Sequence, residues 1–382
     1  MRKIICLLLS VCFLSALSGS GCADSDGKKH TGLRRLDDDG YLYYMDYTED
    51  YYSSEIIEAM SRAGLIDSGC SSFFTYNPDG DPISCRNYDY PHRYSEEDRS
   101  LTGLNIVLHC KPEGKYESVA MADAIWCDES NLMLRPGGPD QEDFDTHILD
   151  VIPYECMDGI NEKGLHVAIL KVDIRDGDES ARMIAGSSII LRYILDDCAN
   201  VEEAIDKVHT SIVQPEDWQD NHLFITDAMG HYAVIESRNG EVSVVESDIV
   251  TNFYLSADDL QDYYRNNVLR EAALKVTDEN GEDLYHFGYG HGYHRFIALA
   301  SQLAMCQARD SESYRTVMPE ERALVLLQSV AQNPYTASAG ISMTQYSAIY
   351  NNAARTLTVW PFQNYSISYS FDITGRQLSP QA

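Results

Sequence analysis

The chain has 382 residues, of which 44% are aliphatic or aromatic, so its length allows one to three domains with a sizeable core. Its 29 basic and 60 acidic residues give a formal net charge of −31. This balance argues against nucleic-acid binding, which needs a basic surface, and against adhesion to anionic lipid. The acidity is typical of a protein that stays soluble outside the cell.

Residues 1–23 have the pattern of an export signal peptide. Arg2 and Lys3 precede an apolar run that ends at Leu17, and small residues follow. The apolar run is too short to span a bilayer comfortably. Two outcomes stay open: a lipid anchor on Cys22, although glycine stands where such motifs carry leucine, or cleavage after Ala23. We therefore expect an exported protein that is secreted, periplasmic or lipid-anchored at the cell surface.

The next stretch, residues 24–69, differs from the rest of the chain. A polar part is followed by an acidic part that is rich in tyrosine, and then by the pattern of a short helix over Ser54–Ala63. So many aromatic rings favour packing on a folded body over contact with water. We expect this stretch to dock on the domain that follows. The tyrosines are Tyr41, Tyr43, Tyr44, Tyr47, Tyr51 and Tyr52.

The stretch that begins at Cys70 has the pattern of a β-hairpin. Two runs of strand formers, Ser71–Tyr76 and Pro82–Asn87, flank the turn sequence Asn-Pro-Asp-Gly. The turn would bring Arg86 and Asp89 back to the thiol at the start of the first strand. Taken alone, the pattern also fits an ordinary hairpin with a buried cysteine and a surface Arg–Asp pair.

The remaining elements come in blocks of strands and helices. Blocks favour antiparallel sheets over a parallel doubly wound sheet. We therefore predict an α+β fold of two antiparallel sheets flanked by helices, with residues 70–382 as one domain. Strands are expected over residues 104–110, 118–122, 166–172, 222–227, 231–238, 241–246, 250–255, 344–350, 356–360 and 365–371, helices over 185–198, 201–208, 293–306 and 320–330, and a long loop over 126–150.

Two segments resemble the choloylglycine hydrolase family, the group of N-terminal-nucleophile (Ntn) hydrolases that includes bile salt hydrolases and penicillin V acylases. In that family a catalytic cysteine is followed by arginine 16 residues later and by aspartate 19 residues later, and Cys70, Arg86 and Asp89 keep this spacing. The usual glycine before the arginine is Cys85 here. The sequence MDGINEKGL over Met157–Leu165 resembles a second segment of the family, D-G-x-N-E-K-G-L.

Two later segments extend the resemblance. The sequence IVTN resembles the family's V-x-T-N segment and implies that Asn252 is an oxyanion donor. The sequence YHRF resembles S-x-R-F, with Tyr293 in place of serine, and implies that Arg295 is a second active-site cation. Lys171 stands where the family often has asparagine or tyrosine, so a second oxyanion donor is missing or replaced. We expect Lys171, Tyr293 and His294 on the substrate side.

The resemblance implies a four-layer αββα sandwich and hydrolysis of linear amides, other than peptide bonds, by an N-terminal cysteine. A thiol with a pKa of about 8.5 can pass its proton to an α-amino group with a pKa of about 7.7–8.0. Arg86 would favour the thiolate, and Asp89 is suited to hold the α-ammonium group. This mechanism needs a free amine on Cys70. We therefore interpret residues 24–69 as a propeptide cut between Gly69 and Cys70; the alternative is a surface arm that stays attached.

The expected partner is a small-molecule N-acyl amide: a conjugated bile salt, penicillin V or a related compound. No cofactor is implied. The histidines at 286, 291 and 294 lie in a glycine- and tyrosine-rich stretch without the spacing of a helical ligand pair, so we expect a substrate-side loop and no metal. The sequence leaves a homo-oligomer, such as a tetramer, open. The alternative function is a catalytically inactive ligand-binding protein on the same scaffold.

Overall fold

The chain is described from a computed structural model. The structure describes residues 30–52, 69–90, 104–124, 146–172, 185–211, 221–238, 240–256, 292–309, 314–332 and 343–381, together with residues 127, 139, 144 and 213 and the pairs 276–277 and 283–284. The expected export signal, the expected helix over Ser54–Ala63 and most of the expected loop over 126–150 lie outside these residues.

The first of the two large sheets has nine strands in the order β1-β2-β5-β6-β7-β8-β9-β10-β11. Its strands are paired antiparallel except for β2 and β5, which run parallel. They are β1 (Arg34–Arg35), β2 (Leu42–Tyr47), β5 (Asn105–Cys110), β6 (Ser118–Asp123), β7 (Cys156–Asn161), β8 (His166–Lys171), β9 (Asn221–Thr226), β10 (Tyr232–Arg238) and β11 (Glu241–Val245).

The second sheet has seven antiparallel strands in the order β12-β3-β4-β17-β18-β19-β20. They are β12 (Ile249–Val250), β3 (Gly69–Tyr76), β4 (Pro82–Tyr90), β17 (Met343–Asn351), β18 (Thr356–Pro361), β19 (Ser368–Asp372) and β20 (Gln377–Gln381). Two further strand pairs are β13 (Val276–Thr277) with β14 (Asp283–Leu284), and β15 (Gln307–Arg309) with β16 (Tyr314–Thr316).

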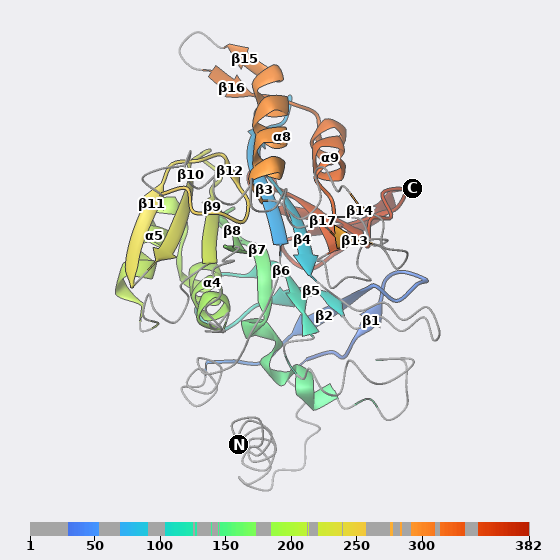
Figure 1. Cartoon of the computed structure of the whole chain (residues 1–382). Helices are drawn as coiled ribbons and strands as arrows, with labels where there is room; N and C mark the ends of the chain where they lie inside the picture. The colour runs from blue at the N-terminus through green and yellow to red at the C-terminus, as the bar shows by residue number, and fades with distance from the viewer. Residues whose placement is uncertain are drawn as a thin grey trace, which may run out of the picture.

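Helices cover the outer face of each sheet (Figure 1). The 3₁₀ helix η3 (Thr146–Tyr154) and helices α4 (Ala185–Asp197) and α5 (Val201–Thr210) pack on the nine-stranded sheet. Helices α8 (Gly292–Met305) and α9 (Glu320–Ser329) pack on the seven-stranded sheet. A third cluster of buried side chains lies between the two sheets. The predicted α+β fold, a four-layer αββα sandwich, is therefore confirmed.

Strand alternation explains how one chain fills three apolar layers. On β8, Val167 and Ile169 belong to the cluster beneath the helices, whereas Ala168 and Leu170 belong to the cluster between the sheets. Successive side chains of a strand point to opposite faces, so a strand covered on both sides is apolar throughout. This is why the central residues of β8 are apolar without alternation.

One expected strand is wrong. The sequence analysis extends a strand over 250–255, but β12 ends at Val250. The backbone N–H groups of Leu255 and Ser256 donate to the buried carboxylate of Glu236, at 2.7 and 3.0 Å, instead of to a neighbouring strand. The apolar sequence of this stretch reflects its burial and not a sheet ladder. The strands without a counterpart among the expected ones are β1, β2, β7, β13, β14, β15, β16 and β20.

The tyrosine-rich stretch is part of the nine-stranded sheet. Its described residues, 30–52, are called the N-terminal arm below. The arm forms β1 and β2 at the edge of the sheet, next to β5 (Figure 1). It is therefore integrated into the sandwich by backbone pairing as well as by side-chain packing. Within the described part of the chain, no helix combines the length and apolarity needed to cross a bilayer.

Candidate active site

The hairpin of β3 and β4 brings the predicted thiol and guanidinium together. Its register pairs Gly69 with Asp89 and Cys70 with Tyr88. Arg86 lies two residues before Tyr88 on the same face of β4, and its Nη2 lies 3.4 Å from Cys70 Sγ. Cys70 and Arg86 are both buried. The predicted hairpin and the meeting of these two side chains are confirmed.

Asn252 and Arg295 approach Cys70 from two other elements. Asn252 follows β12, and its Oδ1 accepts a hydrogen bond of 3.0 Å from the backbone N–H of Cys70. Arg295 lies in the first turn of α8, and its Nη1 donates to the carbonyl oxygen of Cys70 at 2.6 Å. Arg295 also donates to the hydroxyl of Ser71 and to Oδ1 of Asn252. Both predicted residues therefore contact the backbone of the predicted nucleophile.

A glycine allows helix α8 to begin against Asn252. A Cβ atom on Gly292 would lie 2.9 Å from the backbone nitrogen of Asn252, closer than side chains normally pack. The hydroxyl of Thr251 donates to the carbonyl oxygen of Gly292 at 2.7 Å. Together these contacts fix the segment that carries Asn252 against the helix that carries Arg295.

Asp89 is buried beside Arg295. Its carboxylate accepts hydrogen bonds from Thr344 Oγ1 at 2.6 Å and from Gln332 Nε2 at 2.9 Å, and Arg295 Nη1 lies 3.5 Å from its Oδ2. Burial raises the pKa of Asp89, while Arg295 and the two hydrogen bonds oppose that rise. In this arrangement the hydrogen bond of the Cys70 nitrogen goes to Asn252, and Asp89 balances the charge of Arg295.

Arg86 is held by a carboxylate that the sequence analysis did not single out. Its Nε donates to Asp158 Oδ2 at 2.5 Å, and the hydroxyls of Tyr346 and Tyr350 donate to the same carboxylate. All four side chains are fully buried. Asp158 is the aspartate of the MDGINEKGL segment, and the two tyrosines share one face of β17, so both signals were present in the sequence.

Two opposing effects act on the pKa of the Cys70 thiol, namely its burial and the two buried cations beside it. Burial raises the pKa of the Cys70 thiol, and the positive charges of Arg86 and Arg295 oppose this rise. Burial alone would lower the pKa of Arg86, but its interactions with Cys70 and with the Asp158 carboxylate outweigh burial and raise the pKa. Arg86 therefore stays a cation next to the thiol, which is the arrangement that stabilises a thiolate.

The three predicted substrate-side residues lie at the margin of this cluster. Lys171 ends β8, and its carbonyl oxygen accepts a hydrogen bond of 2.6 Å from Asn252 Nδ2. Nδ2 carries a second hydrogen, so the expected role of Asn252 as an oxyanion donor does not require this bond to break. The Tyr293 ring centroid lies 5.4 Å from that of Phe253, and His294 lies beside Arg295 in the first turn of α8.

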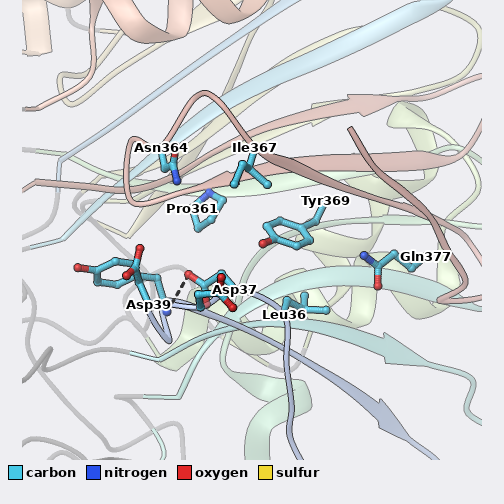
Figure 2. A pocket seen from close by; sticks show the side chains of 10 residues that line it. Leu36, Asp37, Asp39, Pro361, Asn364, Ile367, Tyr369 and Gln377 are labelled. Carbon is cyan, nitrogen blue, oxygen red and sulfur yellow. Dashed lines mark hydrogen bonds between the residues drawn. The ribbon is translucent and has the colours of Figure 1, made fainter. Parts of the chain in front are cut away.

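Among the described residues, no group of three or more histidine, cysteine or acidic side chains is arranged to hold a metal ion. Two of the three clustered histidines, His286 and His291, lie outside the described ranges. A cavity of about 430 Å³ lies elsewhere, between the N-terminal arm and the last strands (Figure 2). Its lining contains none of the predicted site residues.

Three comparisons with known proteins were made. The model of the choloylglycine hydrolase family of linear amide C–N hydrolases matches residues 70–356. A search of the curated proteins finds no match. Among solved structures, a mutant of the conjugated bile acid hydrolase from Clostridium perfringens is similar, with 16% identity, a TM-score of 0.47 and coverage of 82% of this chain and 96% of that one. The penicillin V acylase from Agrobacterium tumefaciens is also similar, with 15% identity, a TM-score of 0.44 and coverage of 80% and 86%.

Proposed function

Because the chain belongs to the choloylglycine hydrolase family of linear amide C–N hydrolases, we propose that Cys70 is its nucleophile, freed by cleavage of the peptide bond before it. The observation that carries this proposal is the convergence of three side chains on one residue. Arg86 lies against the Cys70 thiol, Asn252 against its nitrogen and Arg295 against its carbonyl oxygen.

The first step is removal of the segment before Cys70. The thiol adds to the carbonyl carbon of Gly69, and the C–N bond breaks as the nitrogen of Cys70 takes up a proton. Water then hydrolyses the resulting thioester, which gives a carboxylate on Gly69 and returns the thiol. Gly69 presents no side chain in the path of the thiol. The step needs no cofactor and leaves an α-amino group on Cys70.

This new amine would take the place of the backbone N–H that now bonds to Asn252 Oδ1 at 3.0 Å. In the uncut chain burial raises the thiol's pKa and so disfavours the thiolate. The free amine supplies a base next to the thiol, and Arg86 stabilises the thiolate that results. Cutting before Cys70 therefore gives the thiol a neighbouring base for its reaction with substrate. Arg295 holds the Cys70 backbone in place, and Asp89 holds Arg295.

The second step is hydrolysis of the substrate. The thiolate attacks the amide carbonyl, the amine leaves with a proton from the α-ammonium group, and water releases the acid from the acyl-enzyme. The substrate class we propose is conjugated bile salts, penicillin V or related N-acyl amides. Lys171, Tyr293 and His294 would contact it, because they surround Asn252 and Arg295 in the fold or in sequence.

Hydrolysis of a panel of these amides by purified, processed protein tests the proposal. Cys70→Ala, which is expected to stay uncut, should lower turnover by about 10³-fold or more, as removal of a nucleophile does. Cys85→Ala is the matched control, because Cys85 is a buried cysteine of the same hairpin that packs beneath the helices. A protein that begins at Cys70 but hydrolyses none of the amides would overturn the proposal and favour a ligand-binding role.

We also propose that residues 1–23 direct export, on the sequence pattern alone, since they lie outside the described residues. N-terminal sequencing of the protein recovered from medium and membrane fractions tests this. An N-terminus at or shortly after residue 22 in either fraction is expected. Retention of Met1 in protein found inside the cell would contradict it.

A further inference from the structure

The N-terminal arm is paired with the sheet along the full length of one strand. Strand β2 runs parallel to β5 in a register from Leu42 opposite Asn105 to Tyr47 opposite Cys110. Strand β5 is buried at nearly every position. If the arm left, the backbone groups of a buried strand would lose their partners, which is costly, and the sheet would gain an open apolar edge.

Side chains of β2 fill both apolar layers that flank their sheet. Tyr43, Met45 and Tyr47 belong to the cluster beneath the helices, and Leu42 and Tyr44 belong to the cluster between the sheets. Each of these side chains is at most 6% exposed. Departure of the arm would therefore open two cores at once, and unfilled space in a core is strongly destabilising.

The end of the arm covers a buried ion pair. Arg192 Nη2 lies 2.6 Å from Asp196 Oδ1 within α4, and both side chains are fully buried. The hydroxyls of Tyr51 and Tyr52 donate to the same carboxylate, at 2.8 and 2.5 Å. Burial raises the pKa of Asp196, and Arg192 and the tyrosine hydroxyls oppose the rise. Without the arm this carboxylate would lose two of its donors.

The arm also contacts the second sheet. The ring of Tyr41 stacks on Phe362 with centroids 4.3 Å apart, and Tyr44 stacks on Phe371 at 5.5 Å. The cavity of Figure 2 lies in this seam, with the acidic turn of the arm on one side and Pro361 and Tyr369 on the other. The Asp37 carboxylate is already paired within the arm, because it accepts hydrogen bonds from the backbone N–H groups of Tyr41 and Leu42.

None of these contacts needs a covalent link between the arm and Cys70. We infer that the arm stays bound after the chain is cut, so that the mature protein is a non-covalent complex of a short N-terminal chain and the chain that begins at Cys70. The inference rests on the proposed function only because that function supplies the cut. It assigns to the segment before Cys70 the role of a permanent part of the fold.

Gel filtration of the processed wild-type protein, followed by mass spectrometry of the peak in denaturant, tests the inference. We expect one native peak that contains two chains, one ending at Gly69 and one beginning at Cys70, which separate only in denaturant. A folded, active protein that contains the Cys70 chain alone would overturn the inference and leave the proposed function intact.

If the wild-type chain is never cut, the proposed function fails at its first step, but retention of the arm is still testable. A site for a sequence-specific protease, inserted between Gly64 and Leu65 of the full chain, supplies the cut. Co-elution of both pieces after proteolysis supports the inference. Loss of the arm from a protein that stays folded overturns it.

Variants of the arm give a graded test. Tyr51→Ala is expected to speed release of the cut arm about 100-fold in a fixed, sub-denaturing concentration of urea, because it removes a buried ring. Tyr51→Phe, which removes one hydrogen bond, is expected to speed it about tenfold or less and serves if the alanine variant does not fold. The control is Glu49→Ala at an exposed position, with unchanged release. Equal release from all four proteins would contradict the role of Tyr51.

Discussion

At the scale of single residues, the site is a set of buried charges that neutralise one another. Arg86 lies against the thiol because Asp158 provides a buried countercharge at 2.5 Å, and the hydroxyls of Tyr346 and Tyr350 donate further hydrogen bonds to that carboxylate. A buried ion pair is stable when both charges and their hydrogen bonds are complete, and is costly when one partner is lost. Asp158 is thus a positioning residue for Arg86.

This arrangement predicts that Asp158→Asn lowers the free energy of unfolding by about 3–5 kcal/mol, because it leaves Arg86 without its carboxylate. Tyr350→Phe, which removes one hydrogen bond to the same carboxylate, is expected to cost about 1 kcal/mol. Urea unfolding of the Cys70→Ala protein with and without each change measures this without interference from processing. In processed protein, Asp158→Asn should also shift the pH profile of Cys70 alkylation, and an unchanged profile would argue against a positioning role.

Sequence alone predicts the residues whose neighbours are local or whose motif is familiar. Cys70, Arg86 and Asp89 belong to one hairpin, and the meeting of Cys70 with Arg86 follows from turn chemistry and register. Asp158 was part of a quoted segment but was not assigned a role, because its partner lies on another sheet. Pairing of a buried acid with a distant arginine depends on how the two sheets stack, and no local pattern contains that information.

At the scale of elements, the segment after β12 carries Asn252 without being a strand. Its shape depends on two buried side chains of the other sheet. His222 Nδ1 lies 3.1 Å from the carbonyl oxygen of Thr251, and the Glu236 carboxylate accepts the N–H groups of Leu255 and Ser256. The sequence analysis predicted a strand here, since an apolar run is common to strands and to other buried backbone.

The same contacts predict a dependence of stability on pH. Burial would raise the pKa of Glu236, but His222 and the backbone N–H groups outweigh it and lower the pKa to about 2, from an ordinary value of 4.5. A lowered pKa means that this contribution to stability is present above about pH 4.5 and is lost as the pH falls toward 2. The shift corresponds to about 3 kcal/mol.

Glu236→Gln is therefore expected to unfold at a lower temperature than the wild type near neutral pH and to lose less stability on acidification. Thermal unfolding measured at a series of pH values from about 7 to about 2.5, with the ionic strength held constant, tests this. Glu241→Gln, on the exposed end of β11, is the control and is expected to follow the wild type. Parallel wild-type and Glu236→Gln curves would contradict the assigned role of this carboxylate.

At the scale of the whole molecule, the sandwich includes residues that a simple domain boundary at Cys70 leaves out. The sequence analysis expected the tyrosine-rich stretch to dock on the domain, but it did not predict β2. Strand β2 pairs in parallel with β5, and Leu42 lies opposite Asn105, 63 residues further along the chain. Such a pairing has no turn signal to reveal it, in contrast to the hairpin of β3 and β4.

This architecture predicts that a chain beginning at Cys70, produced behind an initiator methionine, does not reach the soluble native state, because β5 and both apolar layers are left uncovered. Its yield by gel filtration and its amide hydrolysis are expected to fall far below those of a chain that begins at residue 30. Co-production of the arm as a separate peptide should restore part of both. Full activity of the short chain alone would contradict this prediction.

The central claim is that Cys70 becomes an N-terminal nucleophile, and the intact mass of the purified protein in denaturant tests it most directly. Wild-type protein and Cys70→Ala are compared after identical preparation. The account predicts a wild-type mass for a chain that starts at Cys70 and an uncut mass for the variant. A wild-type chain that stays uncut yet hydrolyses amides, or a Cys70→Ala chain cut at the same bond, would contradict it.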